Sequence, residues 1–172
     1  LILAKNYQGY KNLMKLSSKA YLHGFYYRPR IDKDLLAQHS EGLILTSTDI
    51  GGEIPRLLLK GKTKEAYQLA GKYMDIVGKE NFYFELQDHG LQEERLANPQ
   101  IIEMAKEFGR PCVATNDIHY VHRADSKAHD ILLCVQTGKK RADTNRLKFT
   151  NDQFYMKSPE EMAMVFRDFC PE

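Results

Sequence analysis

The sequence predicts an α/β fold built on a parallel sheet or barrel. Short apolar segments of strand length alternate with longer segments whose apolar residues recur at helical spacing, and this alternation is typical of parallel βα architecture. The 172 residues suffice for one domain with a hydrophobic core but hardly for two. Hydrophobic residues make up 42% and charged residues 28% of the chain, which is ordinary for a soluble globular protein.

Four segments are expected to form strands: residues 1–4, 42–46, 82–86 and 111–115. Each is a short apolar run rich in β-branched, leucine or aromatic residues, the composition that strands prefer. The first of them reads as the middle of a buried strand. Polar residues and glycines follow the second, third and fourth runs, so each of these strands is expected to lead into a loop.

Helices are expected between the strands and after the last one, over residues 13–24, 35–37, 57–59, 64–77, 97–108 and 125–135 and from Ser158 onward. Gly24 and Gly109 follow the last periodic apolar residue of their helices, a typical C-terminal stop. Ser158 precedes a proline and two glutamates, which is a strong helix start. Residues 139–151 are polar and charged and predict a surface loop.

The remaining composition narrows the class of protein. The net charge of +2 gives no global basic field for nucleic acid. Cys112, Cys134 and Cys170 are far apart and odd in number, which argues against a disulfide framework and indicates a reducing cytoplasm. No apolar run approaches the roughly 20 residues that span a bilayer. Neither a signal peptide nor an initiator methionine is present, and both ends are expected to be internal to a longer protein.

Chemistry is expected where the strands end, because ligands in parallel α/β folds bind at the carboxyl ends of the strands. Three expected strands deliver acids or histidines there: Asp49; Glu85, Asp88 and His89; and Asp117 and His119. Asp117 and His119 stand at i and i+2, so they point to the same side of an extended chain. A carboxylate oxygen and an imidazole nitrogen placed in this way can bind one divalent ion.

A plainer explanation exists for each candidate. An Asp-x-His motif is common by chance. Asp49 precedes an isoleucine and two glycines, where an ordinary turn or a helix cap is expected. His89 before Gly90 can be a turn residue, and Glu85 can pair with a lysine. A solvated loop is the favoured interpretation of residues 139–141, although their three cations can also contact a phosphate backbone. The other histidines are interpreted as structural or solvated: His23, His39, His122 and His129.

Several blocks of the chain resemble the family of bacterial DNA polymerase III alpha subunits. The first runs from Leu3 to Ser17 and reads LAKNYQGYKNLMKLS. The others follow in the family's order, as GFYYRPRID (24–32), EGLI (41–44), GEIP (52–55), ELQDHG (85–90), ATNDIHYV (114–121) and FYMKSPEEM (154–162). Because these blocks cover almost the whole chain, the resemblance is specific.

The resemblance implies a PHP domain, named for polymerases and histidinol phosphatases, which folds as a distorted seven-stranded (βα) barrel. The chain is then a single partial PHP domain over residues 1–172 that lacks the N-terminal strands of the barrel. Such domains gather histidines and acids around two or three divalent ions. In some members this centre removes nucleotides from a DNA 3′ end; in others it has decayed and supports a separate exonuclease subunit.

The family's final metal motif, Asp-x-His, matches Asp117 and His119. An earlier ligand, commonly cysteine or histidine, corresponds to Asp49, and an aspartate there shifts the preference from zinc toward magnesium or manganese. His89 and Glu85 are the candidates for catalytic or supporting groups. The family's His-x-His and Asp-His motifs and its palm domain fall outside the chain, so the fragment alone is expected to be inactive.

The resemblance therefore implies a metal-dependent phosphodiesterase domain of a cytoplasmic DNA-directed DNA polymerase. Its expected partners are a DNA primer-template, the other holoenzyme subunits and a proofreading exonuclease subunit, with no membrane. A scaffold that docks the exonuclease is the non-catalytic alternative. A free-standing phosphatase of small esters is disfavoured, because the matching blocks extend well beyond the metal motifs.

Overall fold

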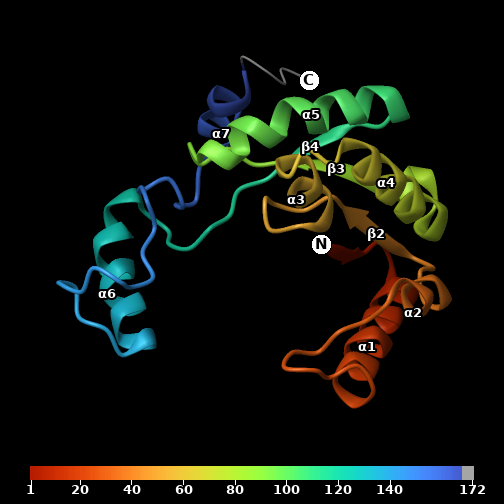
Figure 1. Ribbon diagram of the computed structural model, residues 1–172, viewed down its shortest axis with the longest axis horizontal. Coiled ribbons are helices and arrows are strands. Elements are labelled where there is room, and N and C mark those ends of the chain that lie inside the picture. Colours follow the sequence, from red (N-terminus) through yellow and green to blue (C-terminus); the bar gives the residue numbers. More distant parts are fainter. Residues whose placement is uncertain (168–172) are drawn as a thin grey trace. The chain divides into compact units, whose positions relative to one another are not determined.

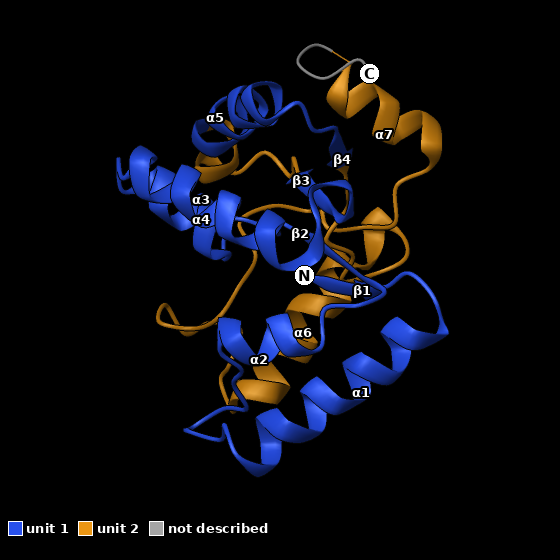
Figure 2. Cartoon of the chain, turned by 90° about the vertical axis from the view of Figure 1, so that its right-hand side faces the viewer, with its two compact units in different colours: residues 1–86, 96–113 blue, residues 87–95, 114–172 orange. Residues whose placement is uncertain are grey.

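The computed structural model describes residues 1–167, which form two compact units (Figure 2). Unit 1 comprises Leu1–Leu86 and Leu96–Val113, and unit 2 comprises Gln87–Arg95 and the chain from Ala114 onward. Each unit is therefore built from two segments of the sequence.

A four-stranded sheet is the framework of unit 1 (Figure 1). Its strands are β1 (Ile2–Ala4), β2 (Leu43–Thr46), β3 (Phe82–Leu86) and β4 (Cys112–Ala114), in the spatial order β1-β2-β3-β4. The four expected strands and the α/β class are confirmed. The described residues contain this one four-stranded sheet, and the seven-stranded barrel stays a prediction.

The direction of β1 differs from the expected parallel arrangement. β2 and β3 are parallel, with Leu45 opposite Phe82, but β1 is antiparallel to β2, with Leu3 opposite Ile44. The reason lies at Gly42: its carbonyl oxygen accepts a hydrogen bond from the Lys5 amide at 2.8 Å. The chain thus returns, at the start of β2, to the place where β1 ended, and β2 must run back alongside β1.

The expectation that the first strand is buried is wrong. β1 lies at the end of the strand order and pairs only with β2. Leu1 and Leu3 are 55% and 47% exposed, whereas Leu43 and Leu45 of β2 are buried. An apolar run identifies a strand, but a strand at the sheet edge leaves part of its side-chain surface uncovered.

Five helices accompany these strands: α1 (Tyr7–Leu22), α2 (Lys33–Gln38), α3 (Glu53–Leu59), α4 (Thr63–Val77) and α5 (Gln92–Phe108). A short 3₁₀ turn, Lys79–Asn81, precedes β3. The Asn6 side chain caps α1 by accepting the Gly9 amide at 2.9 Å. α1 ends at Leu22, slightly before the predicted Gly24.

The core of unit 1 forms around β3, whose Phe82, Phe84 and Leu86 are fully buried. Tyr73 of α4 stacks on Phe82 with ring centroids 6.3 Å apart, and Phe108 of α5 stacks on Phe84 at 6.0 Å. α4 contributes a stripe of buried residues at helical spacing, namely Ala66, Ala70, Met74 and Val77. The strand is mostly apolar because helices cover it, as the βα pattern predicts, and Glu85 is its one charged residue.

Unit 2 contains the first turn of α5, a 3₁₀ turn at Arg123–Asp125, α6 (Ser126–Thr137) and α7 (Pro159–Phe166). The Ser158 side chain accepts the Glu161 amide and the Glu161 carboxylate accepts the Ser158 amide, so the predicted helix start is confirmed. Residues 139–151 form the predicted loop without helix or strand.

Two of the three cysteines lie within the described residues. Cys112 is half-buried and Cys134 is buried; Cys170 lies outside the described residues. None of the helices in the described part of the chain has both the length and the apolar character that crossing a membrane requires.

Candidate metal site

The predicted pair Asp117 and His119 lies in an extended segment that follows β4. His119 Nε2 is 3.1 Å from Asp117 Oδ2, and the two side chains are 37% and 42% exposed. Ile118 between them is also exposed. The i, i+2 spacing therefore places a carboxylate and an imidazole side by side at the surface of unit 2.

Residues far along the chain hold the backbone of this motif in place. The Phe154 carbonyl oxygen accepts hydrogen bonds from the amides of His119 at 2.9 Å and Tyr120 at 3.3 Å. The Asn116 side-chain amide donates to the Tyr155 carbonyl oxygen at 2.7 Å. The Asp117–His119 loop is thus fixed by backbone contacts on both sides of the pair.

His89 belongs to a buried hydrogen-bonded pair in the same unit. Its side chain is only 2% exposed and that of Glu94 is 3% exposed, with His89 Nδ1 2.7 Å from Glu94 Oε1. The other carboxylate oxygen of Glu94 accepts the backbone amides of His89 at 2.7 Å and Leu91 at 3.0 Å. Because an ionised carboxylate only accepts hydrogen bonds, His89 Nδ1 carries a proton and donates it to Glu94.

The opposite edge of the His89 ring contacts the segment of Asn116 and Asp117. Its Nε2 atom accepts the Asp117 backbone amide at 3.1 Å and lies 3.1 Å from Asn116 Oδ1. The ring stacks on Phe154 with centroids 4.6 Å apart and an interplanar angle of 1°. The structure therefore places His89 beneath the backbone of Asp117, with both ring nitrogens engaged.

Aromatic rings surround His119. These residues were not assigned to the site from the sequence. The His129 ring of α6 lies 5.5 Å from the His119 ring, and the Phe149 ring lies 4.6 Å from it. Burial lowers the pKa of His129, and the electrostatic interaction with the neighbouring His119 ring lowers it further. His129 was interpreted as structural or solvated; no spacing rule links a helix residue to a motif ten positions earlier.

Lys157 also approaches the loop. Its Nζ atom lies 3.3 Å from Asn116 Oδ1 and 4.8 Å from the centre of the Tyr155 ring. Burial is the largest influence on this lysine and lowers its pKa. No local sequence pattern predicts this contact, because it joins residues 41 positions apart.

Asp49 lies in unit 1, in the turn between β2 and α3. Its Oδ1 atom accepts the Gly51 amide at 2.9 Å, and its backbone carbonyl accepts the Gly52 amide at 2.9 Å. This is the ordinary turn that was expected as the alternative to a metal ligand at Asp49. A Cβ atom on Gly52 would lie 2.3 Å from the Thr48 methyl carbon, so only glycine fits there.

Glu85 also lies in unit 1, within β3, and is 4% exposed. The Thr46 hydroxyl donates a short hydrogen bond to its carboxylate, and the Glu85 amide donates to Ser47 Oγ at 2.8 Å. These contacts join the ends of β2 and β3. Asp49 and Glu85 thus belong to unit 1, whereas Asp117 and His119 belong to unit 2.

The donor atoms of Asp117 and His119 fit a divalent ion as two of its ligands. Carboxylate oxygen suits magnesium and manganese, and imidazole nitrogen suits zinc, copper, iron and nickel. Within residues 1–167, no group of three or more histidine, cysteine, aspartate or glutamate side chains is arranged to hold an ion. The pair is therefore a partial site as far as the described residues go.

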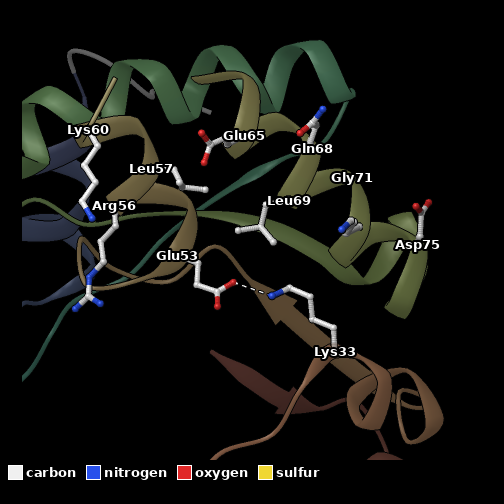
Figure 3. Close-up of a pocket in the computed structure, with 11 residues that line it drawn as sticks. Lys33, Glu53, Arg56, Leu57, Lys60, Glu65, Gln68, Leu69, Gly71 and Asp75 are labelled. Carbon is white, nitrogen blue, oxygen red and sulfur yellow. Dashed lines mark hydrogen bonds and ion pairs between the residues drawn. The ribbon is translucent and has the colours of Figure 1, made fainter. Parts of the chain in front are cut away.

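A separate groove of about 840 Å³ lies on unit 1 along α3 and α4 (Figure 3). Its acid Glu53 is paired with Lys33 at 3.1 Å and accepts the Tyr73 hydroxyl at 2.7 Å. Neither Asp49 nor Glu85 lines it. The groove is therefore separate from the predicted site residues of unit 1.

Curated relatives match nearly the whole chain. It is 54% identical over 166 residues to "DNA polymerase III subunit alpha" of Treponema pallidum (strain Nichols), covering 96% of this chain and 14% of that protein. The protein of the same name from Borreliella burgdorferi is 49% identical, over 98% of this chain and 15% of that protein. The one from Thermus aquaticus is 43% identical, over 95% of this chain and 13% of that protein. The chain spans about one-seventh of these relatives.

The family model of the PHP domain matches residues 1–89, about half of the chain. The matched part contains the sheet strands β1, β2 and β3 and the loop residues up to His89. The resemblance seen in the sequence is thus confirmed: this chain belongs to the PHP domain family.

Proposed function

We propose that this chain is the PHP portion of a bacterial DNA polymerase III alpha subunit and contributes metal-dependent hydrolysis of a phosphodiester bond at a DNA 3′ end. The adjacent, solvent-accessible Asp117 and His119 side chains carry the proposal. The high identity to alpha subunits over nearly the whole chain supports the choice of parent protein.

Asp117 and His119 would supply two ligands of an ion, and Asp49 of unit 1 is likewise proposed as a metal ligand. An ion bound there would activate a water molecule and stabilise charge on the departing oxygen. The aspartate oxygens favour magnesium or manganese over zinc. Glu85, hydrogen-bonded to Thr46, would order the strand ends from which Asp49 follows.

His89 is proposed as a positioning residue. Its Nε2 atom holds the Asp117 amide and its Nδ1 atom is fixed by Glu94. Both nitrogens are occupied and the ring is buried, so the geometry favours support of the ligand loop over proton donation to substrate. Ligand side chains generally depend on such outer contacts for their orientation.

For the parent protein we propose DNA-directed DNA polymerase activity on a primer-template, in the cytoplasm, with the other holoenzyme subunits as partners. The palm chemistry would come from elsewhere in that protein, and the present chain alone would be inactive.

The test is metal stoichiometry, measured by elemental analysis on the complete protein that contains this chain. The wild type is expected to hold at least one tightly bound ion per molecule in this centre. An Asp117→Ala, His119→Ala double variant is expected to lose at least one equivalent, because both donors of the exposed pair are gone.

The matched control replaces one exposed aspartate and one exposed histidine of unit 1, Asp34 and His23, with alanine. It should retain the wild-type ion content. Equal ion content in the wild type and the Asp117, His119 double variant would refute the assignment of this pair as ligands.

A docking scaffold for a separate exonuclease subunit is the second candidate. It is favoured by Asp49, which stands where the family commonly has cysteine or histidine and whose carboxylate already accepts the Gly51 amide. On this alternative the wild-type protein would hold no ion in the centre, and co-sedimentation with a proofreading exonuclease subunit would be unaffected by the double variant.

A further inference from the structure

A second groove, of about 370 Å³, lies on unit 2 between α6 and the loop that follows it. Its lining includes four cations, Lys127, Arg141, Arg146 and Lys148. Pockets of this volume accept a ligand of nucleotide size. The proposed function does not use this groove. Lys127 comes from α6, and the other three cations come from the loop that was interpreted as a solvated surface.

One of the four cations is committed to the fold. Arg146 forms a bidentate pair with Asp130, with Nη2 3.0 Å from Oδ2, and its side chain is only 8% exposed. Arg141 approaches the same aspartate at 3.6 Å but is 69% exposed. Asp152, the other acid of the lining, is paired with Arg123 at 2.8 Å. Both acids of the groove are therefore already neutralised.

Lys127 and Lys148 add positive charge that the two acids of the groove do not balance. Both are exposed, and within the described part of the chain neither forms an ion pair. With Arg141 they present three cationic groups around one concave surface. Such a surface binds phosphate groups by charge and by direct hydrogen bonds.

The groove also contains rings, and the same rings touch His119. His129 and Phe149 line the groove, their rings are 5.0 Å apart, and they lie 5.5 Å and 4.6 Å from the His119 ring. Aromatic faces beside cations are the elements that bind single-stranded nucleic acid, since bases stack on the rings while phosphates meet the charges. The groove is thus continuous with the proposed metal ligand.

A buried hydroxyl lies in the same lining. Tyr120 is 9% exposed, and within residues 1–167 its hydroxyl group makes no hydrogen bond. A buried polar group without a partner is costly, so a polar ligand atom entering the base of the groove would be favoured there.

We propose that this groove binds the terminal nucleotides of a single DNA strand, with Lys127, Arg141 and Lys148 on the phosphates and Phe149 and His129 against a base. The strand's 3′ end would then lie beside His119. This inference rests on the proposed function for the identity of the strand end, but binding itself requires no metal.

The experiment is photo-crosslinking on the complete protein that contains this chain, with metal chelated to prevent hydrolysis. The probe is a single-stranded dT₁₂ oligonucleotide that carries 4-thiothymidine at its 3′ end, and crosslinked peptides are identified by mass spectrometry. In the wild type, crosslinks are expected in residues 127–152. A Lys127→Gln, Lys148→Gln variant should lose at least fivefold of that yield.

The matched control is Lys139→Gln, Lys140→Gln, which removes two exposed lysines from the same loop that do not line the groove. It should keep the wild-type yield. The salt slope of the groove crosslink should fall by about 1.4 in the Lys127, Lys148 variant only, since each single-strand phosphate contact contributes roughly 0.7.

Unchanged crosslinking in the Lys127, Lys148 variant, or an equal loss in both variants, would overturn the proposal. Elemental analysis of the same preparations, carried out before the metal is chelated, separates it from the proposed function. Crosslinks in a protein without bound metal would leave the groove assigned and the hydrolytic centre rejected. Bound metal without crosslinks in residues 127–152 would support the hydrolytic centre and reject the assignment of the groove.

Discussion

Replacing Glu94 with alanine is expected to destabilise unit 2 by about 3–5 kcal/mol, because each donor left in the interior without an acceptor costs about 1–3 kcal/mol. Glu94 accepts hydrogen bonds from His89 Nδ1 and from the amides of His89 and Leu91. The variant would leave the two buried His89 donors and the half-buried Leu91 amide without this acceptor. Hydrogen exchange measured by mass spectrometry should show a matching loss of protection in residues 87–95 and 114–121.

Glu93→Ala is the matched control for this change. Glu93 occupies the same first turn of α5 but is exposed, so its loss should alter the free energy of opening by less than about 0.5 kcal/mol. If Glu94→Ala left protection near Asp117 intact, the assigned role of the His89–Glu94 pair in holding that loop would be wrong.

Replacing Gly9 with alanine is expected to cost about 3 kcal/mol or more in unit 1, at the upper end of overpacking effects. A Cβ atom on Gly9 would lie 1.8 Å from the Gly42 carbonyl oxygen and 2.6 Å from its carbonyl carbon. The obstacle is backbone, so no side chain can rotate away. Urea unfolding of the complete protein, followed by exchange protection in α1 and β2, measures the loss.

Gly71→Ala provides a control of opposite sign. Gly71 lies inside α4 and has open space around its Cβ position. Alanine is favoured over glycine in a helix interior by about 0.5–1 kcal/mol, so this variant should be slightly more stable than the wild type. Equal behaviour of the two variants would contradict the close approach of α1 and Gly42.

The strands and helices were predictable because their signals are local. The stripe from Ala66 to Val77 repeats at helical spacing, and the run from Phe82 to Leu86 is apolar except for Glu85. Ser158 and the two glutamates of the first turn indicate the start of α7 within four residues. The antiparallel direction of β1 was missed because it depends on Gly42 meeting residues more than 30 positions earlier, a contact that leaves no local pattern.

For the candidate site, too, the local features were predictable from the sequence and the tertiary contacts were not. The i, i+2 spacing brought Asp117 and His119 together, and the glycines after Asp49 correctly indicated a turn. His89 before Gly90 looked like an exposed turn residue, yet it is buried, because its partner Glu94 follows five residues later and its stacking partner Phe154 is far along the chain. The contribution of Phe149 and His129 likewise depends on tertiary packing.

The two-segment construction of unit 2 has a consequence for the order of events on the ribosome. The carbonyl of His89 is hydrogen-bonded by Asn151, which is synthesised 62 residues later. At about 5–20 residues per second, the ribosome needs roughly 3–12 seconds to cover that interval. Glu94 emerges almost at once, so the nascent chain can form the His89–Glu94 pair early but must carry it uncovered until Asn151 and Phe154 arrive.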